Sequence, residues 1–183
     1  RAIIKEHETS MKKAVAFLDN EYKSLRTGRA STGLIDNLRV LYYGNMTPLN
    51  QMATINAPDA GSLVIKPFDP ASSKDIEKAI RTSDLGLTPM TDGQVIRIPI
   101  PPLSGERRKQ IASQVKQMAE QARISIRNIR RDANKHLDDE EKSKLISEDQ
   151  RDSAKKEIDE LTKKYTAEID SHCKNKTEDV LNS

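Results

Sequence analysis

The residues with the clearest chemical potential are arginines that recur at helical spacing in the second half of the chain. At 100° per residue, Arg123, Arg127 and Arg130 fall within about 60° of one another on a helix. Four further polar residues lie in this sector or at its edge: Lys109, Lys116, Arg131 and Asn134. A guanidinium group binds phosphate oxygens through paired hydrogen bonds. The spacing therefore predicts a surface that binds the backbone of a nucleic acid.

The charge distribution supports this prediction. The chain carries 31 basic and 28 acidic residues, a net charge of only +3. Residues 105–134, however, hold eight basic and three acidic side chains, a net of +5, whereas residues 135–183 hold ten and fourteen, a net of −4. A solvated face with internal ion pairs is the alternative. Only Glu120 and Asp132 are near enough in sequence to neutralise the arginines, which favours nucleic acid and a salt-dependent affinity.

The kind of nucleic-acid contact can be narrowed. The chain has four Tyr, two Phe and no Trp, and none of these neighbours the basic stretch, so a stacking platform for single-stranded bases is not expected. Zinc-finger and basic-zipper patterns are also absent from the sequence. Backbone contact with a folded, double-helical RNA or DNA fits better than base recognition.

Catalytic and metal-binding patterns give little support to an enzyme. The sequence has no phosphate loop, no dinucleotide-binding glycine motif, no H-E-x-x-H and no G-x-S-x-G. His136 and His172 fall on or near apolar helix stripes, and Cys173 points about 100° away from its neighbour His172. The acidic run at residues 138–141 could bind a cation but is more typical of a solvated helix end. No cofactor, metal or active site is expected. No apolar run is long enough to predict a membrane span.

The positions of glycine and proline divide the chain. All seven glycines and all eight prolines lie between Gly28 and Gly105. Because these residues disfavour a helix interior by about 1 and 3 kcal/mol, the flanks are predicted to be long helices. Apolar stripes cover residues 3–26, 105–145 and a third segment that begins at the capping box of Ser147 and Gln150. Three such stripes in one chain predict a three-helix bundle, with an open coiled coil as the alternative.

The middle of the chain is predicted to be a small α+β domain or an open barrel. Strand patterns cover residues 34–43, 52–56, 63–67 and 94–100, and a short helix covers 73–84, so the last two strands and the helix suggest a β-α-β unit. The expected bundle is residues 1–28 plus 105–183, and the expected inserted domain is 31–103. Two glycine-containing linkers then form a candidate hinge, made of Thr27, Gly28, Arg29, Ala30 and Ser31 on one side and Leu103, Ser104 and Gly105 on the other.

Several motifs together resemble the ribosome recycling factor family. The matching segments, in order, are residues 26–30 (RTGRA), 42–44 (YYG) with 47–49 (TPL), 78–80 (KAI) followed by 83–87 (SDLGL), 98–103 (IPIPPL), 106–109 (ERRK), 127–134 (RNIRRDAN) and 146–149 (ISED). The similarity covers nearly the whole chain. Residues 89–91 and the extreme C-terminus show no specific match.

The resemblance implies a fold, a task and partners. The implied fold is an elongated three-helix bundle with a small β/α/β domain inserted between helices 1 and 2. The implied task is to bind the large ribosomal subunit of the post-termination complex and, with elongation factor G and GTP, to separate the subunits. Contact with large-subunit ribosomal RNA carries over to Arg127, Arg130 and Arg131, with Arg123 on the same face. A monomer in the bacterial cytoplasm is implied, with an organelle matrix or stroma as the alternative. From the residues alone, a helical adaptor for an acidic protein and an enzyme hidden in the middle domain are the rival hypotheses.

Overall fold

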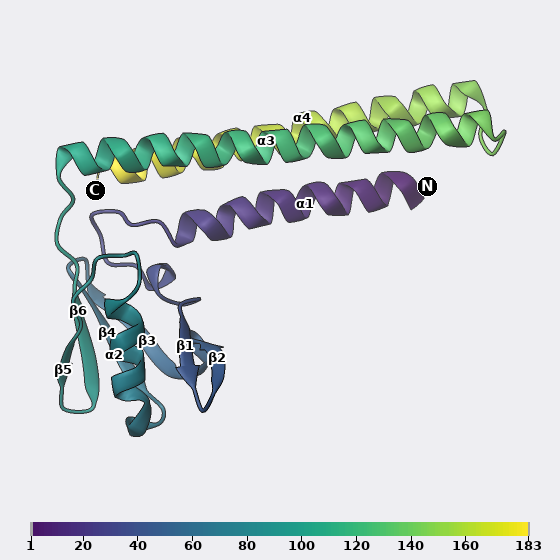
Figure 1. Cartoon of the computed structure of the whole chain (residues 1–183). Helices are drawn as coiled ribbons and strands as arrows, with labels where there is room; N and C mark the ends of the chain where they lie inside the picture. Colours follow the sequence, from purple (N-terminus) through teal and green to yellow (C-terminus); the bar gives the residue numbers. More distant parts are fainter. Residues whose placement is uncertain (1, 183) are drawn as a thin grey trace. The chain divides into compact units, whose positions relative to one another are not determined.

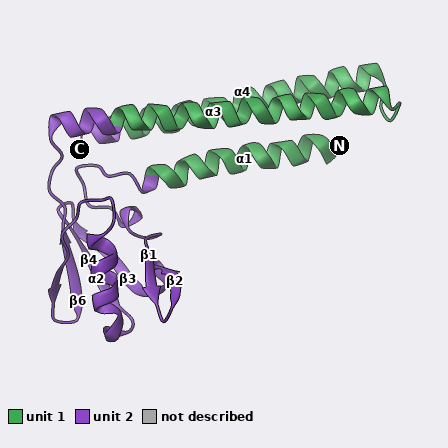
Figure 2. Cartoon of the chain, in the orientation of Figure 1, with its two compact units in different colours: residues 1–22, 112–178 green, residues 23–111, 179–183 purple. Residues whose placement is uncertain are grey.

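The computed structural model describes residues 2–182 and divides the chain into two compact units (Figures 1 and 2). Unit 1 comprises residues 1–22 and 112–178, and unit 2 comprises residues 23–111 and 179–183. The long helices are α1 (Ala2–Lys23), α3 (Gly105–Lys142) and α4 (Glu148–Asn182). None of the helices in residues 2–182 is long and apolar enough to span a membrane.

Unit 1 consists of α1 and most of α3 and α4, as the glycine- and proline-free flanks predicted. The apolar stripes meet in the interior, where Met11, Leu18, Ile126 and Ile158 are essentially inaccessible to solvent. Two buried tyrosines tie α1 to the other helices. The hydroxyl of Tyr22 donates to the Val115 carbonyl at 2.7 Å. The hydroxyl of Tyr165 donates to a Glu8 carboxylate at 2.8 Å.

A tight turn joins α3 to α4. Lys144 adopts a left-handed conformation with φ of 60°, and the amides of Lys144 and Leu145 donate back to the carbonyls of Glu141 and Glu140. This pattern is a Schellman motif, which satisfies the last carbonyl groups of the helix. α4 then begins behind the predicted capping box. The Gln150 amide donates to Ser147 Oγ at 3.1 Å, and the Ser147 amide donates to Gln150 Oε1 at 2.8 Å.

Unit 2 holds two antiparallel sheets and a short helix. Its strands are β1 (Arg39–Tyr42), β2 (Asn45–Pro48), β3 (Ala53–Asp59), β4 (Ser62–Pro67), β5 (Met90–Asp92) and β6 (Val95–Pro99), with α2 at Ser73–Arg81. Strands β1 and β2 form one sheet, and the other has the order β3-β4-β6-β5. The β-α-β sequence order around α2 is present, but β4 and β6 are antiparallel neighbours rather than a parallel crossover pair.

The structure corrects two local predictions in unit 2. The first strand begins at Arg39 rather than residue 34, because residues 32–34 form a short 3-10 helix and the following residues turn. Strands β2 and β5 lie over residues where no strand was predicted. The hairpin turn between β1 and β2 is Tyr43-Gly44. Both turn residues have positive φ, 48° and 79°, as a two-residue type I′ turn requires.

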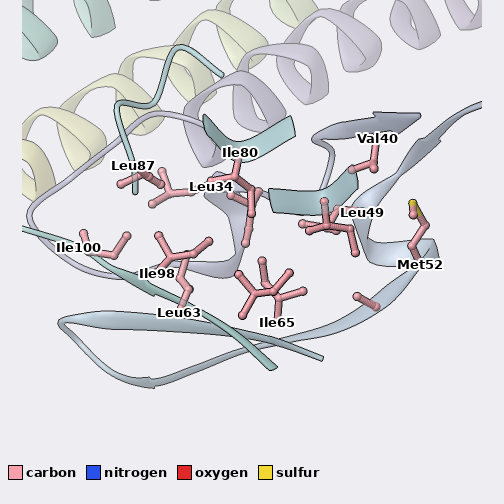
Figure 3. Packing of buried hydrophobic residues seen from close by; sticks show 14 residues of the cluster. Leu34, Val40, Leu49, Met52, Leu63, Ile65, Ile80, Leu87, Ile98 and Ile100 are labelled. Atoms are coloured by element: carbon pink, nitrogen blue, oxygen red, sulfur yellow. The ribbon is translucent and has the colours of Figure 1, made fainter. Parts of the chain in front are cut away.

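The core of unit 2 packs the four-stranded sheet against α2 and the first sheet (Figure 3). Leu63, Ile65 and Ile98 point from β4 and β6 toward Ile80 of α2, and all four are fully buried. The alternation of buried and exposed residues along β4 and β6 explains why these two strands were predictable from the sequence.

Candidate nucleic-acid interface

Part of the predicted basic stretch surrounds an open hollow in the surface of unit 1. We call it the arginine hollow. It measures about 500 Å³ and is lined by Arg127, Arg130, Arg131, Asn134, Lys135 and Asp138. Four cations therefore face one carboxylate. All of these residues lie on α3, where positions three and four apart share a face. The hollow can accept a group with several oxygen atoms and negative charge.

Arg130 is held at one edge of its guanidinium group. Its Nε atom lies 3.0 Å from Oδ1 of Asp159 on α4, and the two side chains are 47% and 48% exposed. Although the carboxylate is half exposed, the Oδ1 atom itself is shielded from solvent. The contact is therefore an ion pair at short distance, but its Nε–H group is not aligned for a hydrogen bond to Oδ1, which has no hydrogen-bond partner among the described residues.

Arg123 lies deeper than the helical spacing suggested. Its side chain is only 25% exposed and makes ion pairs with Asp170 at 2.8 Å and Glu120 at 3.2 Å. Burial lowers the pKa of Arg123, but the hydrogen bonds that its guanidinium group donates to Asp170 and Glu120 outweigh this effect and leave the pKa raised above its ordinary value. Arg123 is thus committed to bonds within the protein.

Arg127 remains mostly exposed, at 54% of its side chain, and its Nη2 atom lies 2.7 Å from Oε1 of Glu120. The hydrogen bonds from Arg127 and then Arg123 lower the pKa of the Glu120 carboxyl group. An exposed ion pair of this kind contributes little to stability. Arg127 can therefore exchange Glu120 for a phosphate at little cost.

The other predicted cations are exposed. Arg131, Lys109 and Lys116 lie at the surface, and within residues 2–182 none of them has a carboxylate at ion-pair distance. Lys109 belongs to unit 2 by the division of the chain, whereas Lys116 and Arg131 belong to unit 1. Asn134 is half-buried, and its Oδ1 atom has no hydrogen-bond partner among the described residues.

Sequence reasoning missed Lys135 and the acidic groups of α4. Lys135 follows Arg131 by four positions, so the helical periodicity could have included it. The pairing with α4 was not visible, because only the register of two antiparallel helices brings Asp159 and Asp170 to the arginines. The ion pairs show that register: from Arg123 to Asp138 on α3, the partners run from Asp170 back to Lys155 on α4.

The groups considered for metal binding are engaged elsewhere or dispersed. Asp138 pairs with Lys155 at 2.7 Å, and this hydrogen bond lowers the pKa of the Asp138 carboxyl group. The rings of His7 and His136 meet edge to face at 5.3 Å, without a third ligand. No group of three or more His, Cys, Asp and Glu side chains in the described part of the chain is arranged to hold a metal ion.

Residues that precede the two linkers of the candidate hinge are bonded to each other within unit 2. Arg26, next to the first linker, donates through Nη2 to the Pro101 carbonyl at 2.5 Å. Burial, and then the nearby charge of Arg107, lower the pKa of Arg26. The amide of Ala30 donates to the Ala60 carbonyl, so the first linker contacts the turn between β3 and β4, and the amide of Ile100, three residues before the second linker, donates to the Gly61 carbonyl of the same turn.

The individual hinge residues differ in exposure. Thr27 and Leu103 are buried, whereas Arg29, Ser31, Ser104 and Gly105 are exposed. Gly28 and Ala30 are half-buried. The Ser104 hydroxyl accepts a hydrogen bond from the Arg107 amide at 3.1 Å, so Ser104 is the N-cap of α3.

Comparisons with known proteins agree over almost the entire chain. A sequence model described as Ribosome recycling factor matches residues 18–181. Two relatives named Ribosome-recycling factor come from Lawsonia intracellularis and Heliobacterium modesticaldum. The first is 45% identical and covers 98% of this chain and 95% of its own length. The second is 47% identical and covers 98% and 97%.

Two solved structures are also similar. A solution structure of the ribosome recycling factor aligns with a TM-score of 0.79 and 39% identity, covering 100% of this chain and 97% of the other. A second structure, titled as models for the T. thermophilus ribosome recycling factor and the E. coli elongation factor G bound to the E. coli post-termination complex, aligns with a TM-score of 0.68. It is 42% identical and covers 98% of this chain and 97% of the other. On these grounds the chain belongs to the ribosome recycling factor family.

Proposed function

We propose that this protein binds the large ribosomal subunit of the post-termination complex and, with elongation factor G and GTP, promotes separation of the subunits for a new round of translation. Membership of the ribosome recycling factor family and the similarity to a recycling factor bound with elongation factor G support the task. The single structural observation that carries the binding step is the arginine hollow on α3.

The hollow suits the phosphate backbone of folded ribosomal RNA. Arg127, Arg130 and Arg131 offer planar donors that match phosphate oxygens, and Lys135 adds a further charge. No tyrosine or phenylalanine lines the hollow, so stacking on unpaired bases is not the mode of contact. Affinity then comes from released counterions and falls with salt.

We assign different roles to the predicted residues. Arg127, Arg130 and Arg131 contact RNA directly, with Asn134 beside them. Lys109 and Lys116 extend the positive charge along α3. Arg123 supports the surface from within, because Asp170 and Glu120 occupy its donors.

The second part of the proposal concerns the linkers. Thr27–Ser31 and Leu103–Gly105 form a hinge that lets the inserted domain move while the helices stay attached to the ribosome. The bond from Arg26 to Pro101 supports this role, since it holds the chain segments that lead into the two linkers next to each other. In this scheme elongation factor G moves the inserted domain and supplies the energy through GTP hydrolysis. The protein itself acts as a monomer in the compartment of its ribosomes.

Subunit separation from post-termination ribosomes tests the proposal. Light scattering would follow the splitting of bacterial ribosomes with elongation factor G and GTP, with and without the protein. We expect splitting with the wild type and a strong loss when Arg127 and Arg131 are both replaced by Ala. Lys163→Ala removes an exposed cation of α4 outside the hollow and should split normally. Equal activity of the double variant and the wild type would contradict the assignment of the hollow.

A further inference from the structure

Two aspartates of α4 lie beside the Nε atoms of arginines of α3. Asp170 accepts a hydrogen bond from Nε of Arg123 at 2.8 Å. Asp159 Oδ1 lies 3.0 Å from Nε of Arg130 as an ion pair without hydrogen-bond geometry. In both pairs the printed contact is to Nε rather than to the fork of two Nη atoms.

The two arginines differ in what remains free. Arg123 also gives Nη1 to Glu120, and only a quarter of its side chain is exposed. Arg130 has no carboxylate other than Asp159 within ion-pair distance in residues 2–182, and about half of its side chain is exposed. A guanidinium group has five N–H donors, so a contact at Nε leaves the Nη edge available for a bidentate bond to phosphate.

Asp159 is suited to act as a fixed anchor. Its Oδ1 atom is shielded from solvent and has no hydrogen-bond partner among the described residues, so the Arg130 guanidinium group at 3.0 Å is the charge that compensates it. The long arginine side chain would otherwise sample many rotamers, and holding it before binding reduces the entropy lost when a phosphate is bound.

We propose that Asp159 is a positioning residue for RNA recognition: it holds Arg130 by Nε so that the Nη edge faces the arginine hollow. This inference rests on the proposed contact between the hollow and the RNA backbone. It assigns to an acidic residue a favourable effect on binding a polyanion, because the gain in pre-organisation of Arg130 exceeds the repulsion between one screened carboxylate and the phosphates.

Asp159→Asn separates this role from a simple effect of charge. If only net charge mattered, the loss of a carboxylate beside the hollow would strengthen binding to RNA. If Asp159 positions Arg130, the same change weakens binding to RNA. We expect the Kd for large ribosomal subunits to rise about three- to tenfold, the range for immobilising one flexible side chain.

The experiment measures binding of the full protein to large ribosomal subunits by co-sedimentation over a salt series. Glu160→Gln is the matched control, since it removes one exposed carboxylate from the neighbouring position of α4. Asp159→Glu retains the charge and should recover part of the affinity. Thermal unfolding of each variant shows whether weaker binding comes from a loss of folded structure rather than from a loss of Arg130 positioning.

A double-variant cycle makes the test specific. In an Arg130→Ala background, Asp159→Asn should have no further effect, because there is no guanidinium group left to position. The inference is overturned if Asp159→Asn binds as well as Glu160→Gln or more tightly, or if it weakens binding equally in both backgrounds. If Arg130→Ala binds like the wild type, the proposed RNA contact fails as well, and the two failures are thereby distinguished.

Discussion

Tyr22 provides a sharp test of how α1 is held in unit 1. The residue is 3% exposed, and its hydroxyl donates to the Val115 carbonyl of α3 at 2.7 Å. Tyr22→Phe keeps the ring and removes the hydroxyl, and with it this bond and the weaker interaction with the Cys173 thiol of α4. Burial, followed by the charge of Cys173, raises the pKa of Tyr22, so the hydroxyl stays protonated and continues to donate at neutral pH.

The expected loss follows from what each partner retains. A net intramolecular hydrogen bond contributes about 0.5–1.5 kcal/mol. The Val115 carbonyl lies inside α3 and still accepts its own helical hydrogen bond, so removing the hydroxyl does not leave it unpaired. We therefore expect the free energy of unfolding to fall by about 1 kcal/mol. For a protein of this size that corresponds to a fall in Tm of about 2–4 °C.

Thermal and urea denaturation, followed by far-ultraviolet circular dichroism, would measure the change. Tyr43→Phe is the control, because its side chain is 78% exposed and its hydroxyl donates to Asp69 at the surface. A surface change of this kind should stay within about 0.5 kcal/mol. Equal losses in the two variants, or no loss in Tyr22→Phe, would refute the claim that this buried bond holds α1 to α3.

Three further predictions concern other parts of the fold. A Cβ on Gly33 would lie 2.8 Å from the Lys23 carbonyl oxygen, so Gly33→Ala should destabilise unit 2 by about 1–3 kcal/mol in urea unfolding. Lys144→Gly should stabilise the protein by up to about 1 kcal/mol in the same assay, because glycine adopts the left-handed conformation of the α3–α4 turn without strain. Burial, and then the hydrogen bond to Glu8, raise the pKa of Tyr165 to about 12. The folded state thus keeps a proton that the unfolded chain loses near pH 10, and stability should fall as pH rises from about 10 to 12, less steeply in Tyr165→Phe.

Simple outcomes would contradict these expectations. Gly105→Ala is the control for Gly33→Ala, since a Cβ there meets nothing within 4 Å, and equal effects of the two changes would refute the steric argument. A loss of stability in Lys144→Gly would mean that the lysine side chain makes a favourable contact that outweighs the strain. Identical alkaline unfolding of the wild type and Tyr165→Phe would show that this tyrosine does not contribute to the pH dependence.

Local signals made the helices predictable. Glycine and proline occur only in the middle of the chain, so the flanks could be predicted as helices. The expected helix over 105–145 is observed as Gly105–Lys142. The capping box at Ser147 was visible because its two hydrogen bonds join residues three positions apart. The Schellman turn was not visible, since Lys144 gives no sign in sequence of its positive φ.

Features that depend on pairing between distant segments were harder to predict. The antiparallel arrangement of β4 and β6 depends on the path of the chain through α2, which the strand patterns do not specify. For the candidate site, helical periodicity placed Arg127 and Arg130 on one face. It could not show that Asp170 would engage Arg123, because that contact spans 47 positions and depends on the register of α3 against α4.

The central claim is that the arginine hollow binds the RNA backbone of the large ribosomal subunit. Co-sedimentation of the wild type and Arg130→Ala with large subunits, over a salt series, tests it most directly. The wild type should bind with an affinity that falls steeply as salt rises, and the variant should bind more weakly with a salt slope reduced by about 1. Equal affinities and equal slopes for the two proteins would contradict the claim.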